Sequence, residues 1–207
     1  YLLDSGYDIK RPDPSSVPGP IHPIKTGKDY KRYAFPKKGE YVSPFGVPGY
    51  GEGFVSFDSH EHTEDAHITE DRSLRKAMVE KRLKKLEALT AEAVLPIVIG
   101  PEKYDTAVIC WGSVFEPVKE AMEMLGCKDA ALIACEQVYP LSEEFRKIIS
   151  SPCRKIFVEG NATGQFSRVV RSLTGTGADE TILKYNGFQF TVEELAGELD
   201  KLLNVRS

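Results

Sequence analysis

The second half of the chain alternates between two hydrophobic periodicities. Unbroken apolar runs at residues 106–110, 130–135 and 155–158 are typical of strands that are buried on both faces. Around them, apolar residues recur at helical spacing. These helical stripes are Val118, Ala121, Met122 and Leu125; Phe166, Val169, Val170 and Leu173; and Val192, Leu195, Ala196, Leu199, Leu202 and Leu203. The order β-α-β-α-β-α predicts an α/β fold, a three-layer domain with a mainly parallel sheet over residues 101–207.

Local signals place some of the helix starts. A Ser or Thr three residues before a Glu has the spacing of a capping box, in which each side chain bonds the other's backbone. Two such pairs precede predicted helices: Ser113 with Glu116, and Thr191 with Glu194. A further helix is predicted ahead of the domain, capped by Thr69 and running to about Leu89. We assign residues 69–100 to this long linking helix and the segment after it.

Residues 1–68 are predicted to form an extended connector rich in Pro, Gly and aromatic residues. Most prolines of the chain lie between Gly6 and Gly53, which excludes long regular elements there. Aromatic residues are interleaved from Tyr30 to Phe57, whereas a solvated linker would be depleted in them. We expect this segment to wrap on a surface, and a partner protein is one candidate. The chain opens as if within an element, so we expect an N-terminal portion before it.

Composition narrows the classes of partner. With 41% hydrophobic and 28% charged residues in 207, the chain is typical of a globular protein. A formal charge of −4 and a pI near 5.7 argue against nucleic acid as a partner. The longest apolar run, residues 93–100, is far shorter than the ~20 residues that cross a bilayer, so no membrane partner is expected.

The four cysteines do not form a ligand pattern. Cys110, Cys127, Cys135 and Cys153 include no CxxC pair, and two of them lie in the predicted strands. We interpret them as reduced core residues, which favours a cytoplasmic location. A metal or iron–sulfur site made by this chain alone is not expected.

Ligands of parallel sheets bind beyond the carboxyl ends of the strands, which directs attention to the turns at residues 111–113 and 159–165. The second turn combines Asn161, Thr163, Gly164 and Gln165, with Arg168 one turn into the next helix. Free N–H groups at that helix start could hold an anion, or the turn could contact another subunit. In the alternative interpretation, Asn161 or Thr163 only caps the helix and the glycines serve the turn.

A second polar cluster lies ahead of the long helix. His60 and His62 are followed by Glu64, Asp65 and His67, at a spacing that could reach one metal ion. The set forms no recognisable group of ligands, so we assign no metal here. A plain polar loop is the alternative. The sequence contains no GxSxG, P-loop or GxGxxG motif, and no catalytic residue is assigned.

Taken together, widely spaced motifs of the chain resemble one enzyme family, the 2-oxoacid:ferredoxin oxidoreductases, in their alpha subunits. The likeness is best to the 2-oxoglutarate type. The motifs are Tyr30-Lys31-Arg32-Tyr33, Ser43-Pro44, Val47-Pro48-Gly49, His60-Glu61-His62, Ile68-Thr69-Glu70-Asp71 and residues 78–82. Further on, Trp111-Gly112-Ser113, Val138-Tyr139-Pro140 and residues 158–165 resemble the transketolase C-terminal-like domain of the same subunits.

This resemblance implies an enzyme that decarboxylates a 2-oxoacid on thiamine diphosphate and Mg, passes electrons through an iron–sulfur cluster to ferredoxin, and forms an acyl-CoA. It implies a beta subunit as partner, with gamma and delta subunits as further candidates, and coenzyme A and ferredoxin as reactants. The family's Tyr-Pro-Ile-Thr-Pro motif belongs to an N-terminal thiamine-fold domain and does not occur here. The chain would therefore bind no cofactor alone, would be inactive alone, and would be structural and subunit-contacting.

Two other interpretations remain open at this point. One is a stand-alone ligand-binding or structural α/β domain without enzyme activity. The other is a transketolase-type dehydrogenase component, which would share the last domain but not the motifs at residues 60–81.

Overall fold

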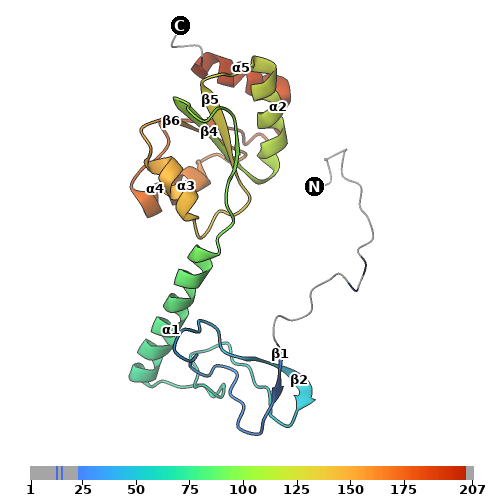
Figure 1. Cartoon of the computed structure of the whole chain (residues 1–207), viewed down its shortest axis with the longest axis vertical. Coiled ribbons are helices and arrows are strands. Elements are labelled where there is room, and N and C mark those ends of the chain that lie inside the picture. The colour runs from blue at the N-terminus through green and yellow to red at the C-terminus, as the bar shows by residue number, and fades with distance from the viewer. Residues whose placement is uncertain (1–12, 14, 16–22, 204–207) are drawn as a thin grey trace. The chain divides into compact units, whose positions relative to one another are not determined.

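The computed structural model describes residues 13, 15 and 23–203, and these fall into two units (Figure 1). The first unit extends to Ala88 and the second begins at Leu89. The expectation that the chain opens within an element, and much of the proline-rich start, lie outside the described residues. Each unit is described by itself below.

The first unit is held together mainly by side chains that bond the backbone. Strands β1 (Pro23–Thr26) and β2 (Phe45–Gly51) pair in parallel. The Tyr30 hydroxyl donates to the Pro44 carbonyl over 3.0 Å and accepts the Gly46 N–H over 2.8 Å. The interleaved aromatic residues therefore organise a segment that has little regular structure.

Helix α1 (Arg72–Ala91) follows, and its start differs from the predicted one. Asp71, not Thr69, is the capping residue, since its Oδ1 accepts the N–H groups of Ser73 (2.7 Å) and Leu74 (3.1 Å). The Thr69 hydroxyl oxygen instead accepts the N–H of Asp71 over 3.2 Å. A carboxylate two and three residues before those N–H groups is the better placed acceptor, so the helix begins later than predicted.

The second unit contains a five-stranded sheet in the order β3-β5-β4-β6-β7. Its strands are β3 (Ile97–Ile99), β4 (Thr106–Trp111), β5 (Ala130–Cys135), β6 (Arg154–Glu159) and β7 (Glu180–Leu183). Strand β3 runs antiparallel to β5, and the other pairs are parallel. The predicted α/β class and mainly parallel sheet are confirmed.

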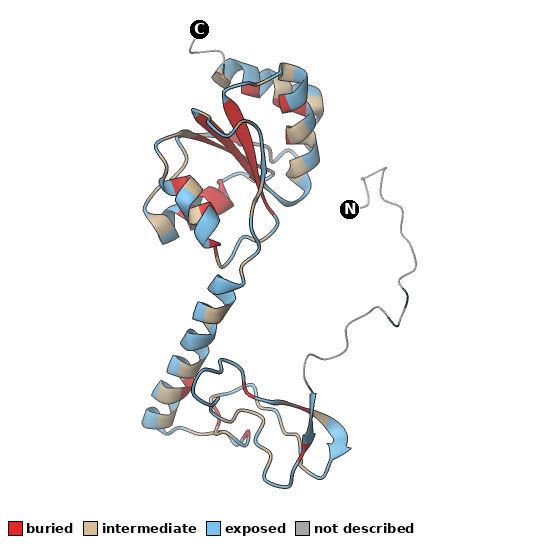
Figure 2. Cartoon of the chain, in the orientation of Figure 1, coloured by how far each residue is buried: buried red, intermediate tan, exposed pale blue. Residues whose placement is uncertain are grey.

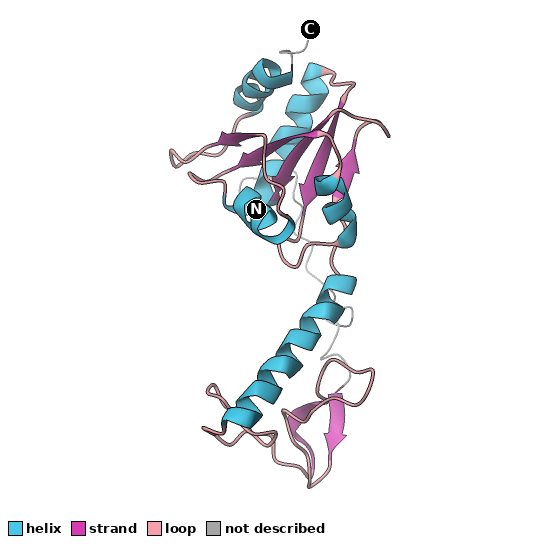
Figure 3. Ribbon diagram, turned by 90° about the vertical axis from the view of Figure 1, so that its left-hand side faces the viewer, coloured by secondary structure: helices cyan, strands magenta, loops and turns pink. Residues whose placement is uncertain are grey.

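Helices cover both faces of this sheet (Figure 3). Helices α2 (Phe115–Leu125) and α5 (Val192–Leu203) pack on one face, and α3 (Glu143–Ser150) and α4 (Gln165–Thr174) pack on the other. Alternate strand residues enter the two cores: Val108 and Cys110 face α2 and α5, whereas Ala107 and Ile109 face α3 and α4. Figure 2 shows the central strands as the buried centre of three layers.

Two local predictions for this unit need correction. Residues 112–114 form a turn of 3-10 helix and Val114 precedes α2 without a side-chain cap, so Ser113 and Glu116 make no capping box. The box at Thr191 and Glu194 is confirmed, with N···O distances of 3.0 and 3.2 Å.

Three elements of this unit were not predicted. Strands β3 and β7 are short and only partly buried. Helix α3 has eight residues, of which Phe145 and Ile149 are buried, too short for a helical stripe to stand out.

Candidate functional site

The two turns singled out in the sequence lie side by side at the carboxyl edge of the sheet. They follow β4 and β6, which are neighbouring parallel strands. The ring centroids of Trp111, at the end of β4, and Phe166, in the first turn of α4, are 6.4 Å apart. Helix α2 leaves β4 toward one face of the sheet and α4 leaves β6 toward the other. This divergence is the arrangement in which parallel sheets hold ligands or partners.

The turn after β6 is built around Glu159, the last residue of the strand, whose side chain is fully buried. Its carboxylate accepts the N–H groups of Phe166 (2.8 Å) and Ser167 (2.9 Å) and the side-chain amide of Asn161 (2.8 Å). A negative charge at a helix start also interacts favourably with the helix dipole. Glu159 therefore fixes the strand, the turn and the helix relative to one another.

Sequence analysis did not assign a role to Glu159. The sequence did contain a signal for this role, a carboxylate at the end of an otherwise apolar strand. A buried charge is rare unless hydrogen bonds or an opposite charge stabilise it, so such a residue is expected to have several partners.

Asn161 and Gly164 stabilise the turn, the first through hydrogen bonds of its side chain and the second through its backbone conformation. The Asn161 Oδ1 accepts the N–H groups of Thr163 (3.1 Å) and Gln165 (3.2 Å). Gly164 has a φ of 61°, and a Cβ built on it would lie 2.9 Å from the Ser167 hydroxyl oxygen. The conformation therefore needs glycine.

The side chains of Thr163, Gln165 and Arg168 are exposed around this turn. The N–H groups on which the anion hypothesis rested, those of residues 165–167, already donate to Asn161 and Glu159. An external anion would have to compete with a buried carboxylate of the chain itself. The N-cap residue of α4 is Gly164, without a side-chain cap, so neither Asn161 nor Thr163 is the capping residue. Asn161 bonds the N–H of Gln165, and Glu159 bonds the next two N–H groups of the helix.

The structure does not bring His60 and His62 together. His60 is exposed, with its Nδ1 3.4 Å from Asp58 Oδ1. His62 is buried and its ring stacks on Tyr33, with centroids 3.7 Å apart. Within the described ranges, no group of three or more His, Cys, Asp or Glu side chains could hold a metal ion.

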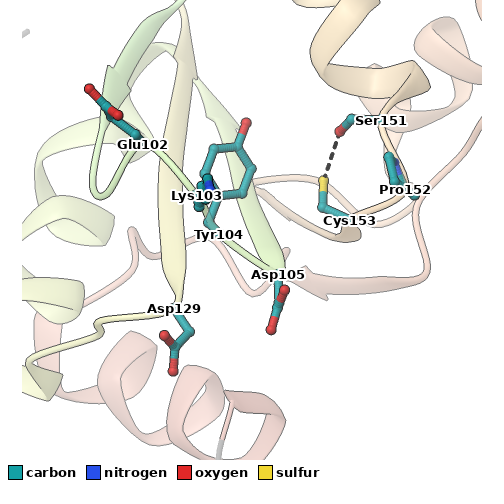
Figure 4. A pocket seen from close by; sticks show the side chains of 8 residues that line it. All are labelled: Glu102, Lys103, Tyr104, Asp105, Asp129, Ser151, Pro152 and Cys153. Carbon is teal, nitrogen blue, oxygen red and sulfur yellow. Dashed lines mark hydrogen bonds between the residues drawn. The ribbon is translucent and has the colours of Figure 1, made fainter.

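A cavity of about 560 Å³ lies at the opposite, amino edge of the sheet (Figure 4). It is lined by Glu102, Lys103, Tyr104, Asp105, Asp129, Ser151, Pro152 and Cys153. Burial raises the pKa of Tyr104, and the Cys153 thiol contacts the Ser151 hydroxyl at 3.2 Å. Because this cavity is at the amino ends of β4, β5 and β6, it is remote from the edge where parallel sheets place their ligands.

The cysteines do not fit an iron–sulfur cluster. Cys110 and Cys135 are buried on opposite faces of the sheet, and burial raises the pKa of each thiol to about 12. Cluster ligands are thiolates gathered around one point. The described residues offer no such set of thiolates.

Comparison with known proteins gives similarity to one kind of polypeptide. No family model matches the chain. The alpha subunit of 2-oxoacid:ferredoxin oxidoreductase 1 of Sulfurisphaera tokodaii is 31% identical over 180 residues, which covers 84% of this chain and 28% of that protein. The corresponding subunit of enzyme 2 of Aeropyrum pernix is 28% identical over 218 residues, covering 98% of this chain and 33% of that protein. The chain thus spans a third or less of the length of these relatives.

A solved structure shows the same fold. The 2-oxoglutarate:ferredoxin oxidoreductase of Magnetococcus marinus, which holds 2-oxoglutarate, coenzyme A and succinyl-CoA, matches with a TM-score of 0.74 at 24% identity. The match covers 84% of this chain and 31% of that chain. In the part of the chain that the structure describes, no helix is long and apolar enough to cross a membrane.

Proposed function

We propose that this chain is part of the alpha subunit of a 2-oxoacid:ferredoxin oxidoreductase, an enzyme that oxidatively decarboxylates a 2-oxoacid and reduces ferredoxin. The observation that carries this proposal is the similarity to named alpha subunits along 84% of the chain, extending through both structural units. A shared α/β domain alone would not carry it, because one fold serves many functions.

The substrate we propose is 2-oxoglutarate, converted with coenzyme A to succinyl-CoA and CO₂ while an electron pair passes to ferredoxin. The resemblance of the motifs at residues 30–33, 60–62 and 68–71 to the 2-oxoglutarate type supports this choice. Thiamine diphosphate, Mg and an iron–sulfur cluster would be bound by the rest of a cytoplasmic assembly that includes a beta subunit. The described residues gather no group of three or more ligands that could hold a metal ion, and no step of the reaction is assigned to them.

The role proposed for this part of the subunit is structural and subunit-contacting. Its carboxyl edge carries a rigid turn, fixed internally by Glu159 and Asn161, with Thr163, Gln165 and Arg168 exposed. A turn whose own hydrogen bonds are complete can present side chains to a partner in one conformation, which lowers the entropic cost of binding.

The test is purification of the native assembly through an affinity tag on this polypeptide, under anoxic conditions. We expect a co-purifying subunit, iron and thiamine diphosphate, and ferredoxin reduction that is faster with 2-oxoglutarate than with pyruvate or branched-chain 2-oxoacids. A pure polypeptide without partner, iron or thiamine diphosphate would instead support a stand-alone domain.

A further inference from the structure

Arg32 lies within a set of aromatic rings in the first unit. Its guanidinium carbon is 5.5 Å from the ring centroid of Tyr33, 5.1 Å from that of Phe45 and 5.8 Å from that of Phe57. Rings at such distances attract a cation through their electron-rich faces and hold its plane in place. The side chain of Arg32 is therefore partly withdrawn from water and oriented. We call Arg32 with these three rings the Arg32 cage.

The charge of Arg32 has no counterpart among the described residues. The Nε is enclosed by protein without a hydrogen-bond partner. The nearby acidic side chains serve other cations: Glu64 lies 3.4 Å from the Lys31 ammonium, and Glu61 holds Arg82 at 3.0 Å. Since Nε is enclosed, an acceptor can reach the guanidinium only at its two terminal nitrogens.

A second cation adds to the positive potential at this place. The Lys81 ammonium donates to the Tyr33 carbonyl over 2.6 Å and lies 5.6 Å from the ring centroid of Phe35. Burial lowers the pKa of Lys81; the carboxylate of Glu64 partly offsets this, and the charge of Arg32 lowers the pKa further. Two cations thus lie together at this place, and Glu64, whose charge acts on Lys81, is itself paired with Lys31.

Two apolar rings at the edge of the cage are exposed to solvent. Phe57 is 58% exposed, and Phe54, three residues earlier, is 83% exposed. Arginine and aromatic residues are enriched at the hot spots of protein interfaces. The Arg32 cage combines both kinds of residue with exposed rings. Arginine also prefers carboxylates, which its terminal nitrogens can bind in pairs.

We propose that the Arg32 cage docks a partner subunit of the assembled enzyme, through a carboxylate of that subunit bound to the terminal nitrogens of Arg32. The inference rests on the proposed function, because the relatives are alpha subunits, a name that implies further subunits. The cage supplies a preorganised cation and apolar contact area, and the partner supplies a carboxylate for Arg32, whose charge is not paired with Glu61 or Glu64.

The experiment uses the complete assembly and compares Arg32→Met with Arg72→Met, an exposed arginine at the start of α1 in the same unit. Native mass spectrometry on dilution gives the dissociation constant of the subunits. We expect Arg32→Met to weaken association at least about tenfold, Arg32→Lys to weaken it less, and Arg72→Met to change it less than about twofold. Added salt should weaken the wild-type complex more than the Arg32→Met complex.

The remaining outcomes decide the inference. Unchanged association of Arg32→Met overturns it, and so does a variant whose alpha polypeptide melts earlier while its subunits associate normally, because the contact is then internal. If Arg32→Met does not fold, Phe57→Ser removes a ring at a half-exposed position and should still weaken association. A wild-type polypeptide with no partner and no cofactors would overturn the proposed function and the docking together, whereas an active assembly indifferent to Arg32 overturns the docking alone.

Discussion

The buried carboxylate of Glu159 accepts the backbone N–H of Ser167 over 2.9 Å, which ties the end of β6 to the first turn of α4. The same carboxylate binds the N–H of Phe166 and the amide of Asn161. A turn that resembled a binding loop in sequence therefore has the backbone N–H groups of Phe166 and Ser167 bonded within the chain itself.

Replacing Glu159 by Gln should destabilise the second unit by about 2–3 kcal/mol, because an amide NH₂ would face backbone donors and the charge at the helix start would be lost. Urea unfolding measures the effect. Glu123→Gln, at an exposed position of α2, is the matched control and should change stability by less than about 0.5 kcal/mol. Equal effects of the two changes would contradict the role given to Glu159.

Two glycines of the same turn should differ in their tolerance of alanine. Gly164 has a positive φ, and an added Cβ would meet the Ser167 hydroxyl at 2.9 Å, so Gly164→Ala should cost about 1–2 kcal/mol. Gly160 has its nearest atom, Val114 Cγ2, at 4.0 Å and should accept alanine nearly without cost. Thermal unfolding of the two variants tests the contrast, which disappears if the turn is flexible.

Features of the fold and of the turn were predictable from sequence where they depend on residues close together in the chain, and not where they depend on residues far apart. The central strands were predicted because their apolar runs are unbroken, whereas β3, β7 and α3 are too short for their periodicity to stand out. The turn at residues 159–165 was located correctly, but the bonds from Glu159 to the N–H groups seven and eight residues later depend on the folded turn. The stacking of His62 on Tyr33 joins residues far apart in sequence, which the local pattern of histidines could not indicate.

The first unit should lose stability in acid through the pair of Glu61 and Arg82. The hydrogen bond from Arg82 holds the pKa of Glu61 below its ordinary value of 4.5. A carboxyl whose pKa is lowered by folding stabilises the folded state above the unfolded pKa, and this stabilisation is lost as the pH falls through the folded pKa. Melting temperature measured from about pH 6 to about pH 3 should therefore fall less steeply in Glu61→Gln than in the wild type. Parallel curves would show that the pair contributes nothing.

Thiol labelling should divide the cysteines into two classes. Burial raises the pKa of Cys110 and Cys135 to about 12, so both should resist iodoacetamide at about pH 8 in the folded chain. Cys153 is partly exposed beside the amino-edge cavity and should react first. Peptide mass spectrometry after timed labelling identifies the sites, and early labelling of Cys110 or Cys135 would contradict the described core.

We propose that this chain works as part of an enzyme that couples 2-oxoacid decarboxylation to ferredoxin reduction. The most direct measurement is the rate of ferredoxin reduction by the assembly isolated through this polypeptide, with 2-oxoglutarate and coenzyme A added separately and together. We predict rapid reduction only when both are present, and loss of that activity when the polypeptide is removed from the extract by its tag. Reduction that persists in the depleted extract, with none in the isolated fraction, would contradict the claim.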